Sequence, residues 1–283
     1  MSIEVKGLTH IYNEGLPHES VALEGVTFSA QDGQLVGIIG HTGSGKSTLV
    51  QHLNGLLKPK SGSIVVGGTD ITSDGVVMRD IRKKIGLVFQ YPEYQLFEET
   101  VAKDVAFGPA NLGLSEAEID ECVKEAIEMV GLDYEKVKNV SPFELSGGQK
   151  RRAAIAGVIA MKPEVLILDE PTAGLNPKAH ADILNMVETI HRKSKNIIFL
   201  VSHNMNDIAR MSDKVLVMNH GRLVMDGNPA EVFSREEELK SMGLALPDSM
   251  EIMMRLKKAG MDINTDCLTM DEAAEEIAKV LAK

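Results

Sequence analysis

Residues 40–47 are Gly40-His41-Thr42-Gly43-Ser44-Gly45-Lys46-Ser47, which matches G-x-x-x-x-G-K-[ST] at every fixed position. The apolar run Leu35–Ile39 just before it predicts a buried parallel strand, and residues 48–53 just after it predict the opening of a helix. Glycines between a strand and a helix let successive backbone N–H groups point into one concavity, and the helix N-terminus adds its positive end. A glycine turn that only happens to end in Lys-Ser would lack this context. The stretch therefore predicts a site for a nucleoside triphosphate.

Two side chains of this stretch have expected tasks at that site. Lys46 is expected to reach the β- and γ-phosphates, and the Ser47 hydroxyl is expected to ligate Mg²⁺. Upstream, Tyr12 lies in a predicted polar loop between two strands, where its ring either stacks on adenine or caps the edge of the sheet. The predicted ATP-binding residues are Tyr12, Gly40, His41, Thr42, Gly43, Ser44, Gly45, Lys46, Ser47 and Thr48.

Bulk properties exclude several classes of protein. The 283 residues allow one large domain with an appendage, or two modest domains. A net charge of −11 argues against a nucleic-acid surface, and no apolar run approaches the roughly 20 residues that a membrane span needs. The first residues lack the pattern of a signal peptide. Cys122 and Cys267 have no partner spacing, so we expect free thiols in a reducing cytosol.

Four polar side chains follow predicted apolar strands farther along the chain. Asp169 is expected to hold Mg²⁺ through water, and Glu170 to polarise the attacking water. Gln90 could reach Mg²⁺ or its water, and His203 could bind the γ-phosphate or the attacking water. Ligands of open α/β sheets bind at the carboxyl ends of the strands, where all four would lie. Taken singly, they could also be a surface glutamine, two helix-capping acids and a structural histidine.

A second stretch predicts an anion-binding helix end. Residues 111–163 have helical character, with a capping box at Ser115–Glu118. Within them, Leu145, Ser146, Gly147, Gly148 and Gln149 lead into a helix that begins with the basic run Lys150–Arg152. A Ser-Gly-Gly turn at a helix N-terminus can bind phosphate, or it can be a plain cap with a flexible entry. Two such helix ends in one chain favour the interpretation that this one binds phosphate.

The predicted architecture is an α/β fold of the P-loop NTPase type, with a mixed sheet flanked by helices. A helical subdomain is inserted at about residues 90–162, and the ATPase domain spans residues 1–235. Residues 236–283 are charged and predict a small C-terminal helical domain. Its last helix follows a capping box at Thr269 and has an apolar face that needs a partner, either the domain body or another subunit. That face carries Ala273, Ile277, Val280 and Leu281.

Together these stretches resemble the ATPase subunits of ABC transporters, in the order typical of that family and across most of the first 235 residues. The matching segments are a Walker A loop (Gly40–Thr48), a Q-loop (Gln90), a signature (Leu145–Gln149), a Walker B strand (Val165–Asp169) with Glu170, and a switch histidine (His203). The resemblance implies ATP and Mg²⁺ as cofactors, with Mg²⁺ held by Ser47, Gln90 and Asp169. It also implies a dimer in which each signature completes the ATP site of the other subunit.

A narrower resemblance is to the second ATPase of energy-coupling factor (ECF) transporters. It rests on residues 90–97 and 100–109, on the loop with Gly15-Leu16-Pro17, and on the extra C-terminal helices. It implies a heterodimer with another ATPase, a transmembrane coupling subunit and a membrane substrate-binding subunit. The chain would then lie at the cytoplasmic face of the cell membrane and power the uptake of vitamins or of cobalt or nickel ions. Another class of ABC importer is the alternative.

One residue departs from the family pattern, because Asn176 stands where the family usually has aspartate. Asparagine caps a helix equally well, but the lost charge puts the balance between the two ATP sites in doubt. Other ATPase classes fit less well. A DNA-repair ATPase needs a long coiled coil, a ribosome-binding factor usually has two such domains, and a small GTPase needs Asn-Lys-x-Asp where this chain has Asn204–Asp207. Glu170 and His203 weaken the alternative of a nucleotide-binding module without activity.

Overall fold

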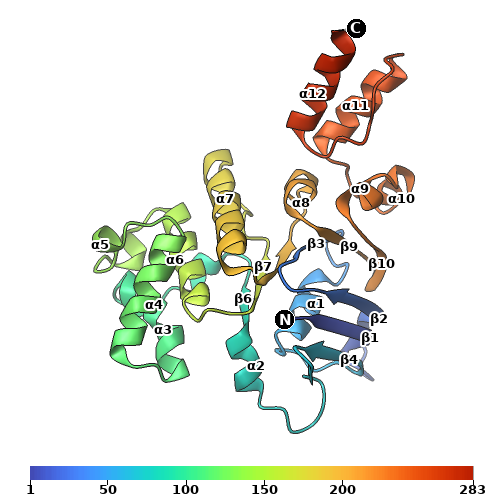
Figure 1. Cartoon of the computed structure of the whole chain (residues 1–283). Coiled ribbons are helices and arrows are strands. Elements are labelled where there is room, and N and C mark those ends of the chain that lie inside the picture. Colours follow the sequence, from blue (N-terminus) through green and yellow to red (C-terminus); the bar gives the residue numbers. More distant parts are fainter. Residues whose placement is uncertain (283) are drawn as a thin grey trace.

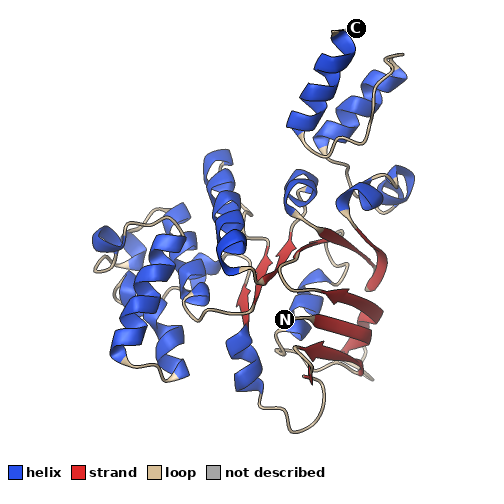
Figure 2. Cartoon of the chain, viewed as in Figure 1, coloured by secondary structure: helices blue, strands red, loops and turns tan. Residues whose placement is uncertain are grey.

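The computed structural model describes residues 1–282, and within them the chain forms two β-sheets surrounded by helices (Figures 1 and 2). The larger sheet has six strands, and its first five are parallel while β10 runs antiparallel to β9. Its strands, in spatial order, are β6 (Ile85–Val88), β7 (Val165–Asp169), β8 (Ile197–Val201), β3 (Leu35–Ile39), β9 (Lys214–Asn219) and β10 (Arg222–Gly227). The predicted mixed sheet is therefore confirmed, and β9 and β10 form an antiparallel hairpin at its edge.

The smaller sheet is antiparallel and covers one face of the larger one. Its strands, in spatial order, are β2 (Ser20–Ala30), β1 (Ile3–Tyr12), β4 (Ser61–Val66) and β5 (Thr69–Asp70). Successive residues of the parallel strands point to opposite faces, so both faces must be apolar. In β7, Val165 and Ile167 pack toward the antiparallel sheet, whereas Leu166 and Leu168 pack toward the helices. The parallel sheet is thus the central layer of the molecule.

Helices fill the other layers. They are α1 (Lys46–Leu53), α2 (Met78–Lys84), α3 (Val101–Leu112), α4 (Glu116–Met129), α5 (Tyr134–Val137), α6 (Gly147–Ile159), α7 (Pro177–Ser194), α8 (Met205–Met211), α9 (Pro229–Phe233), α10 (Glu236–Ser241), α11 (Asp248–Lys258) and α12 (Met270–Leu281). Residues from α3 to α11 share one hydrophobic core with the second face of the parallel sheet. Two short 3₁₀ helices span Pro92–Gln95 and Pro142–Glu144. None of the described helices is long and apolar enough to cross a bilayer.

The helical subdomain consists of α3 to α6 and stands to one side of the sheets (Figure 1). Its capping box at Ser115 and Glu118 has both of its hydrogen bonds, as predicted. Helix α3 begins ten residues before residue 111 but within the subdomain predicted at about residues 90–162, and the Thr100 hydroxyl at its start accepts from the N–H of Lys103. Pro92 opens a 3₁₀ turn, because its fixed φ suits the first position of a helix.

The C-terminal helices divide between two hydrophobic clusters. Leu246 and Met250 belong to the core under the parallel sheet, whereas Met253 belongs to a small separate cluster. That cluster also holds Ile263, Cys267 and Ala273, with Leu256, Ile277 and Val280 packed against it. The apolar face of α12 therefore finds its partner in α11 and the following segment, and only Leu281 at its end stays exposed. The domain boundary at residue 235 stays a prediction.

Candidate functional site

The phosphate-loop glycines stand where no side chain would fit. A Cβ at Gly40 would lie 2.3 Å from the carbonyl oxygen of Met218, and a Cβ at Gly45 would lie 2.6 Å from that of Ala22. Gly45 also has a φ of +103°, which side chains rarely adopt, and it immediately precedes α1. The predicted strand, loop and helix are all present. The loop therefore places the N-terminus of α1 at the carboxyl end of β3, as a phosphate-binding loop requires.

The other loop residues are held by neighbouring segments. His41 Nε2 lies 3.1 Å from the Oδ1 of Asn219, at the end of β9. The N–H of Gly221 donates to the carbonyl oxygen of Ser44 at 3.0 Å, and the Ser44 side chain is fully buried. Thr42 and Gly43 lie at the exposed outer turn of the loop. The hairpin of β9 and β10 thus holds one side of the phosphate loop through hydrogen bonds, and the outer turn of the loop stays accessible.

Lys46 is buried against its own loop. Its Nζ donates to the carbonyl oxygens of Gly40 at 2.7 Å and His41 at 3.0 Å. Burial lowers the pKa of Lys46, and the nearby carboxylates of Glu170 and Asp169 oppose that shift. A phosphate in the loop would offer this ammonium charge-assisted hydrogen bonds, which are stronger than bonds to neutral carbonyls. The position of Lys46 therefore suits the binding of an anion close to the two acids.

Asp169 ends β7 and is buried beside the first turn of α1. Burial raises its pKa, Glu170 adds to the shift, and the hydrogen bond from the Ser47 hydroxyl and the charge of Lys46 oppose it. A raised carboxyl pKa marks a site where a cation would be favourable, because a cation stabilises the ionised form. Hydroxyl and carboxylate oxygens are also the donors that Mg²⁺ prefers. The paired side chains of Ser47 and Asp169 thus have the chemistry of a magnesium site.

The two other predicted catalytic side chains, those of Gln90 and His203, converge on Glu170. The Nε2 of Gln90 donates to Glu170 Oε2 at 3.0 Å, and His203 Nδ1 lies 3.5 Å from Glu170 Oε1. Glu170 directly follows β7, while Gln90 and His203 lie two residues beyond the ends of β6 and β8. The parallel sheet therefore brings all three to one edge. Glu170 itself has a φ of +48°, in the left-handed region. The carboxylate is mostly buried while the His203 ring is mostly exposed, so the group opens toward solvent on the histidine side.

Tyr12 is the one predicted site residue whose backbone setting was wrong. It was expected in a loop, but β1 continues farther than predicted and Tyr12 is its last residue, paired with Ser20 of β2. Its hydroxyl lies 3.3 Å from the Thr48 Oγ1 in the first turn of α1, and its ring meets the His10 ring edge-on at 4.6 Å. The residue as a whole is 38% exposed. Tyr12 therefore lies beside the phosphate loop with part of its surface free.

The signature residues lie away from this edge. Ser146 caps α6, and its N–H and hydroxyl both donate to the side-chain oxygen of Gln149, at 3.0 Å and 2.8 Å. A Cβ at Gly148 would lie 3.7 Å from the Cβ of Ala179, so this helix end adjoins the start of α7. Figure 1 shows α6 and α1 on opposite sides of β6 and β7. The helix ends that follow Leu145–Ser146 and the phosphate loop therefore lie apart within one chain.

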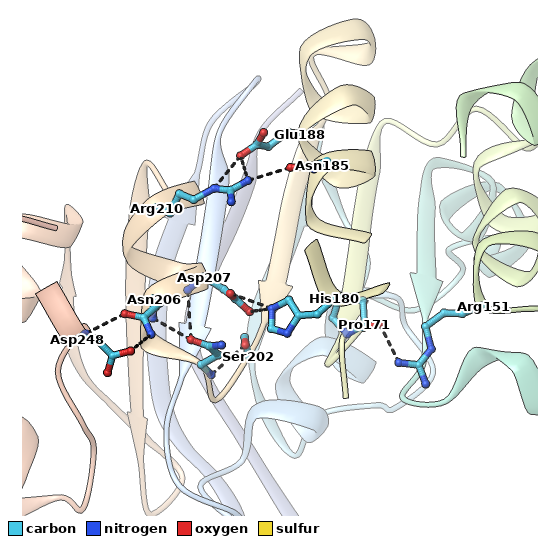
Figure 3. Close-up of polar contacts among 11 residues, drawn as sticks. Arg151, Pro171, His180, Asn185, Glu188, Ser202, Asn206, Asp207, Arg210 and Asp248 are labelled. Atoms are coloured by element: carbon cyan, nitrogen blue, oxygen red, sulfur yellow. Dashed lines mark hydrogen bonds and ion pairs between the residues drawn. The ribbon is translucent and has the colours of Figure 1, made fainter. Parts of the chain in front are cut away.

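Arg151 has a structural part that no sequence pattern indicates, because the pattern shows it only as one residue of a basic helix start. Its guanidinium is buried and donates to both carboxylate oxygens of Glu93, at 2.9 Å and 2.6 Å. It also donates to the carbonyl oxygens of Pro171 at 3.0 Å and Ala173 at 2.7 Å, the former drawn in Figure 3. One side chain thus ties the signature helix to the segments after Gln90 and Glu170. Glu93 is 58 positions away, so no local pattern could reveal the pair.

Comparison with known proteins shows the family of the chain. The sequence model of the family described as ABC transporter matches residues 23–173. The energy-coupling factor transporter ATP-binding protein EcfA2 of Clostridioides difficile (strain 630) is 57% identical over 282 residues, which cover 99% of this chain and 98% of that protein. The protein of the same name from Caldanaerobacter subterraneus subsp. tengcongensis is 58% identical over 281 residues, with the same two coverages.

Solved structures show the same fold. The structure of cbiO1 from Clostridium perfringens, described as part of the ABC transporter complex cbiONQ, is 37% identical and superposes with a TM-score of 0.75 over 91% of this chain and 96% of that one. A dimeric ATP-binding cassette bound to ADP and Pi is 27% identical, with a TM-score of 0.71 over 80% of this chain and 98% of that one. The chain therefore belongs to the ABC transporter family and, within it, to the ATP-binding proteins of energy-coupling factor transporters.

Proposed function

We propose that Glu170 is the general base of the ATP hydrolysis that this family couples to transport. The observation that carries the proposal is the convergence of Gln90, Glu170 and His203 at one edge of the sheet, beside Lys46 and Asp169. A general base must lie within hydrogen-bond reach of the water it deprotonates. Gln90 holds one oxygen of Glu170, so the other oxygen and the His203 ring are left to orient a water in line with the γ-phosphate. Such positioning supplies most of the catalysis in phosphoryl transfer.

The remaining residues of the edge bind and hold the substrate. Lys46 binds the β- and γ-phosphates once they replace the carbonyl oxygens that it now contacts. Ser47 and Asp169 would hold Mg²⁺, and Gln90, the third ligand that the sequence predicts, lies at the same edge of the sheet. When bound, Mg²⁺ neutralises charge on the phosphate oxygens. Tyr12 stacks on the adenine through its exposed ring surface.

The test of Glu170 is the substitution Glu170→Gln, which keeps the shape and removes the base. We expect ATP binding to persist and turnover to fall by roughly 10²-fold or more, the range for loss of a general base. Glu164→Gln makes the same chemical change at an exposed residue just before the other end of β7, and we expect it to turn over normally. Both variants are assayed for ATPase rate and for nucleotide affinity in the complex with the partner subunits. Near-normal hydrolysis by Glu170→Gln would refute the assignment.

We also propose that the chain works in a dimer with a different ATPase. The separation of the signature from the phosphate loop supports this, because Ser146 and Gly148 can then meet phosphate only on a second subunit. ATP would contribute contacts present only in the closed dimer, which is how a ligand shifts an equilibrium. The relatives named EcfA2 and the cbiO1 structure from a cbiONQ complex support the same arrangement.

The membrane partner is proposed to dock on the helical subdomain, at the cytoplasmic face of the cell membrane. A groove of about 530 Å³ runs between α2, the segment after Gln95 and helices α3 and α6. Phe97 and Phe107 meet edge-on at 5.1 Å in this groove and are each at least half exposed, while Arg79 and Arg82 lie on its rim. Exposed aromatic side chains of this kind are typical of interaction sites. The groove adjoins the Gln90 segment, so it could pass the state of the ATP site to a transmembrane coupling subunit.

Isolation of the tagged chain from membranes tests the assembly. We expect a second ATPase, a transmembrane coupling subunit and a substrate-binding membrane subunit to copurify, and their masses can be measured in the intact complex. The proposed cargo is a vitamin or a cobalt or nickel ion, and the substrate-binding subunit recovered with the chain identifies which. Recovery only as a soluble homodimer would refute the assembly and leave the ATPase role standing.

A further inference from the structure

Two hydrogen bonds join the segment of the switch histidine to the C-terminal helices. The Nδ2 of Asn206 donates to Asp248 Oδ2 at 2.9 Å, and the N–H of Asp248 donates to Asn206 Oδ1 at 2.8 Å (Figure 3). Asn206 lies in the first turn of α8, three residues after His203, and Asp248 is the first residue of α11. The pair therefore connects the two helix starts directly.

The turn between His203 and Asn206 is itself held by hydrogen bonds. Asn204 caps α8, with its Oδ1 accepting from the N–H of Asn206 at 3.0 Å and from that of Asp207 at 3.4 Å. The N–H of Asn204 donates to the Ser202 hydroxyl at 3.0 Å. A displacement of Asn206 cannot be absorbed freely in such a turn, so it is passed on to the loop that carries His203.

Helix α8 is fixed to α7 by side chains of its first and last turns. Asp207 accepts from His180 Nε2 at 2.8 Å, and Arg210 donates to Glu188 at 2.7 Å (Figure 3). Helix α7 starts in turn at the Asn176 cap, which adjoins the signature helix. The start of α8 is thus held from two sides, by α7 and by the first residue of α11.

Helix α11 extends from the main core into the separate C-terminal cluster. Ser249 and Met250 in its first turn are almost fully buried against the ATPase core, whereas Met253, one turn later, is buried against α12 and the segment before it. Figure 1 shows α11 and α12 projecting from the body of the molecule. Because α11 is one continuous helix, a force on the projecting pair of helices moves its first residue, Asp248, which binds Asn206.

We propose that the Asn206–Asp248 pair positions the loop carrying His203, so that the C-terminal helical unit sets the rate of ATP hydrolysis. Asn206 and Asp248 are positioning residues, since they reach the reaction only through His203. The inference rests on the proposed role of His203 in hydrolysis. Both side chains are solvent-exposed, so their bonds adjust the loop rather than hold the fold together.

An exchange of the two side chains tests the pair. Asp248→Asn keeps both bonds, because the Asn206 amide can donate to the new amide oxygen, and we expect normal turnover. Asn206→Asp sets two carboxylates against each other, and we expect kcat to fall roughly 3- to 10-fold, the rate equivalent of about one hydrogen bond. The double variant Asn206→Asp with Asp248→Asn restores the side-chain bond with its donor and acceptor exchanged. The backbone N–H of residue 248 still donates to the side chain of residue 206, and we expect kcat to recover.

The ATPase assay uses the assembled transporter complex and follows kcat and KM for ATP separately. KM and the melting temperature are expected to stay unchanged, because the pair lies outside the phosphate loop and is exposed. Normal kcat in Asn206→Asp, or a double variant no faster than Asn206→Asp, would overturn the inference. His203→Ala is measured in parallel. If it is slow while Asn206→Asp is normal, the inference alone fails; if His203→Ala hydrolyses ATP normally, the proposed role of His203 fails and the inference falls with it.

Discussion

Replacement of Arg151 by methionine should destabilise the chain far more than an ordinary substitution at a helix start. Methionine keeps the apolar stem but removes every donor to Glu93, Pro171 and Ala173. Two carbonyl groups without partners would cost about 1 kcal/mol each, and a partly buried carboxylate without its cation about 1–2 kcal/mol more. The sum, about 3–4 kcal/mol, agrees with the cost of removing one partner of a buried ion pair. It corresponds to a fall in Tm of about 6–16 °C for a domain of this size.

The neighbouring arginine provides a matched control. Arg152 has one long hydrogen bond, at 3.4 Å to the carbonyl oxygen of Gly131, on an exposed part of the surface. Arg152→Met should therefore change stability by less than about 0.5 kcal/mol. Urea unfolding of both variants, followed by circular dichroism, gives the two values directly. The double variant Arg151→Met with Glu93→Gln should regain part of the loss, because the unpaired charge is gone. An Arg151→Met variant within about 1 kcal/mol of the wild type would refute the reasoning.

Three further outcomes are expected. Because the Tyr12 ring is proposed to stack on adenine, Tyr12→Ala should weaken ATP binding by about 1–2 kcal/mol and Tyr12→Phe by much less. Calorimetric titration measures both affinities. An unchanged dissociation constant for Tyr12→Ala would leave the residue a structural role only. Burial is the largest single effect on the pKa of Glu93, and it raises that pKa. The hydrogen bond and ion pair with Arg151, together with a backbone hydrogen bond, outweigh burial, so the pKa of Glu93 lies below its ordinary value of 4.5. Ionised Glu93 therefore stabilises the fold above about pH 4.5, and this contribution is lost as the pH falls through the lowered pKa. The difference in Tm between wild type and Glu93→Gln should be constant near neutral pH and should disappear on acidification. A difference that does not depend on pH would contradict the assignment. Ser146→Arg should impair hydrolysis at the partner's nucleotide more than at the site built on Lys46, since a bulky cation blocks the end of α6; rates measured with one ATP site disabled at a time distinguish the two sites, and equal losses would count against the proposed dimer.

Local patterns predicted the central part of the fold well. The strand Leu35–Ile39 and the strands that end at Asp169 and Val201 are short apolar runs, and each leads directly into a residue of the proposed site. Their side chains meet because parallel strands share an edge, which is a rule of topology that needs no alignment. The caps at Ser115, Asn176 and Thr269 were likewise visible, since capping depends on residues only three positions apart.

Long-range pairings could not be predicted in the same way. The end of β1 at Tyr12 depends on its partner Ser20, and the polar residues between them suggested a loop that begins earlier. Arg151 was predicted only as one of three basic residues at a helix start, whereas the folded chain buries it and compensates for the burial with Glu93 and two backbone carbonyls in distant segments. The partner of the α12 face was left open for the same reason, because only the folded chain brings α11 alongside it.

The left-handed backbone of Glu170 has a consequence for the evolution of the chain. That conformation costs an ordinary L-residue about 1–2 kcal/mol, whereas glycine adopts it freely and asparagine more readily than most. Selection for thermal tolerance alone would therefore favour replacing the very carboxylate that is proposed to drive hydrolysis. A library of mutants chosen for heat resistance should be enriched in inactive members at position 170, and only selection for transport would keep glutamate there.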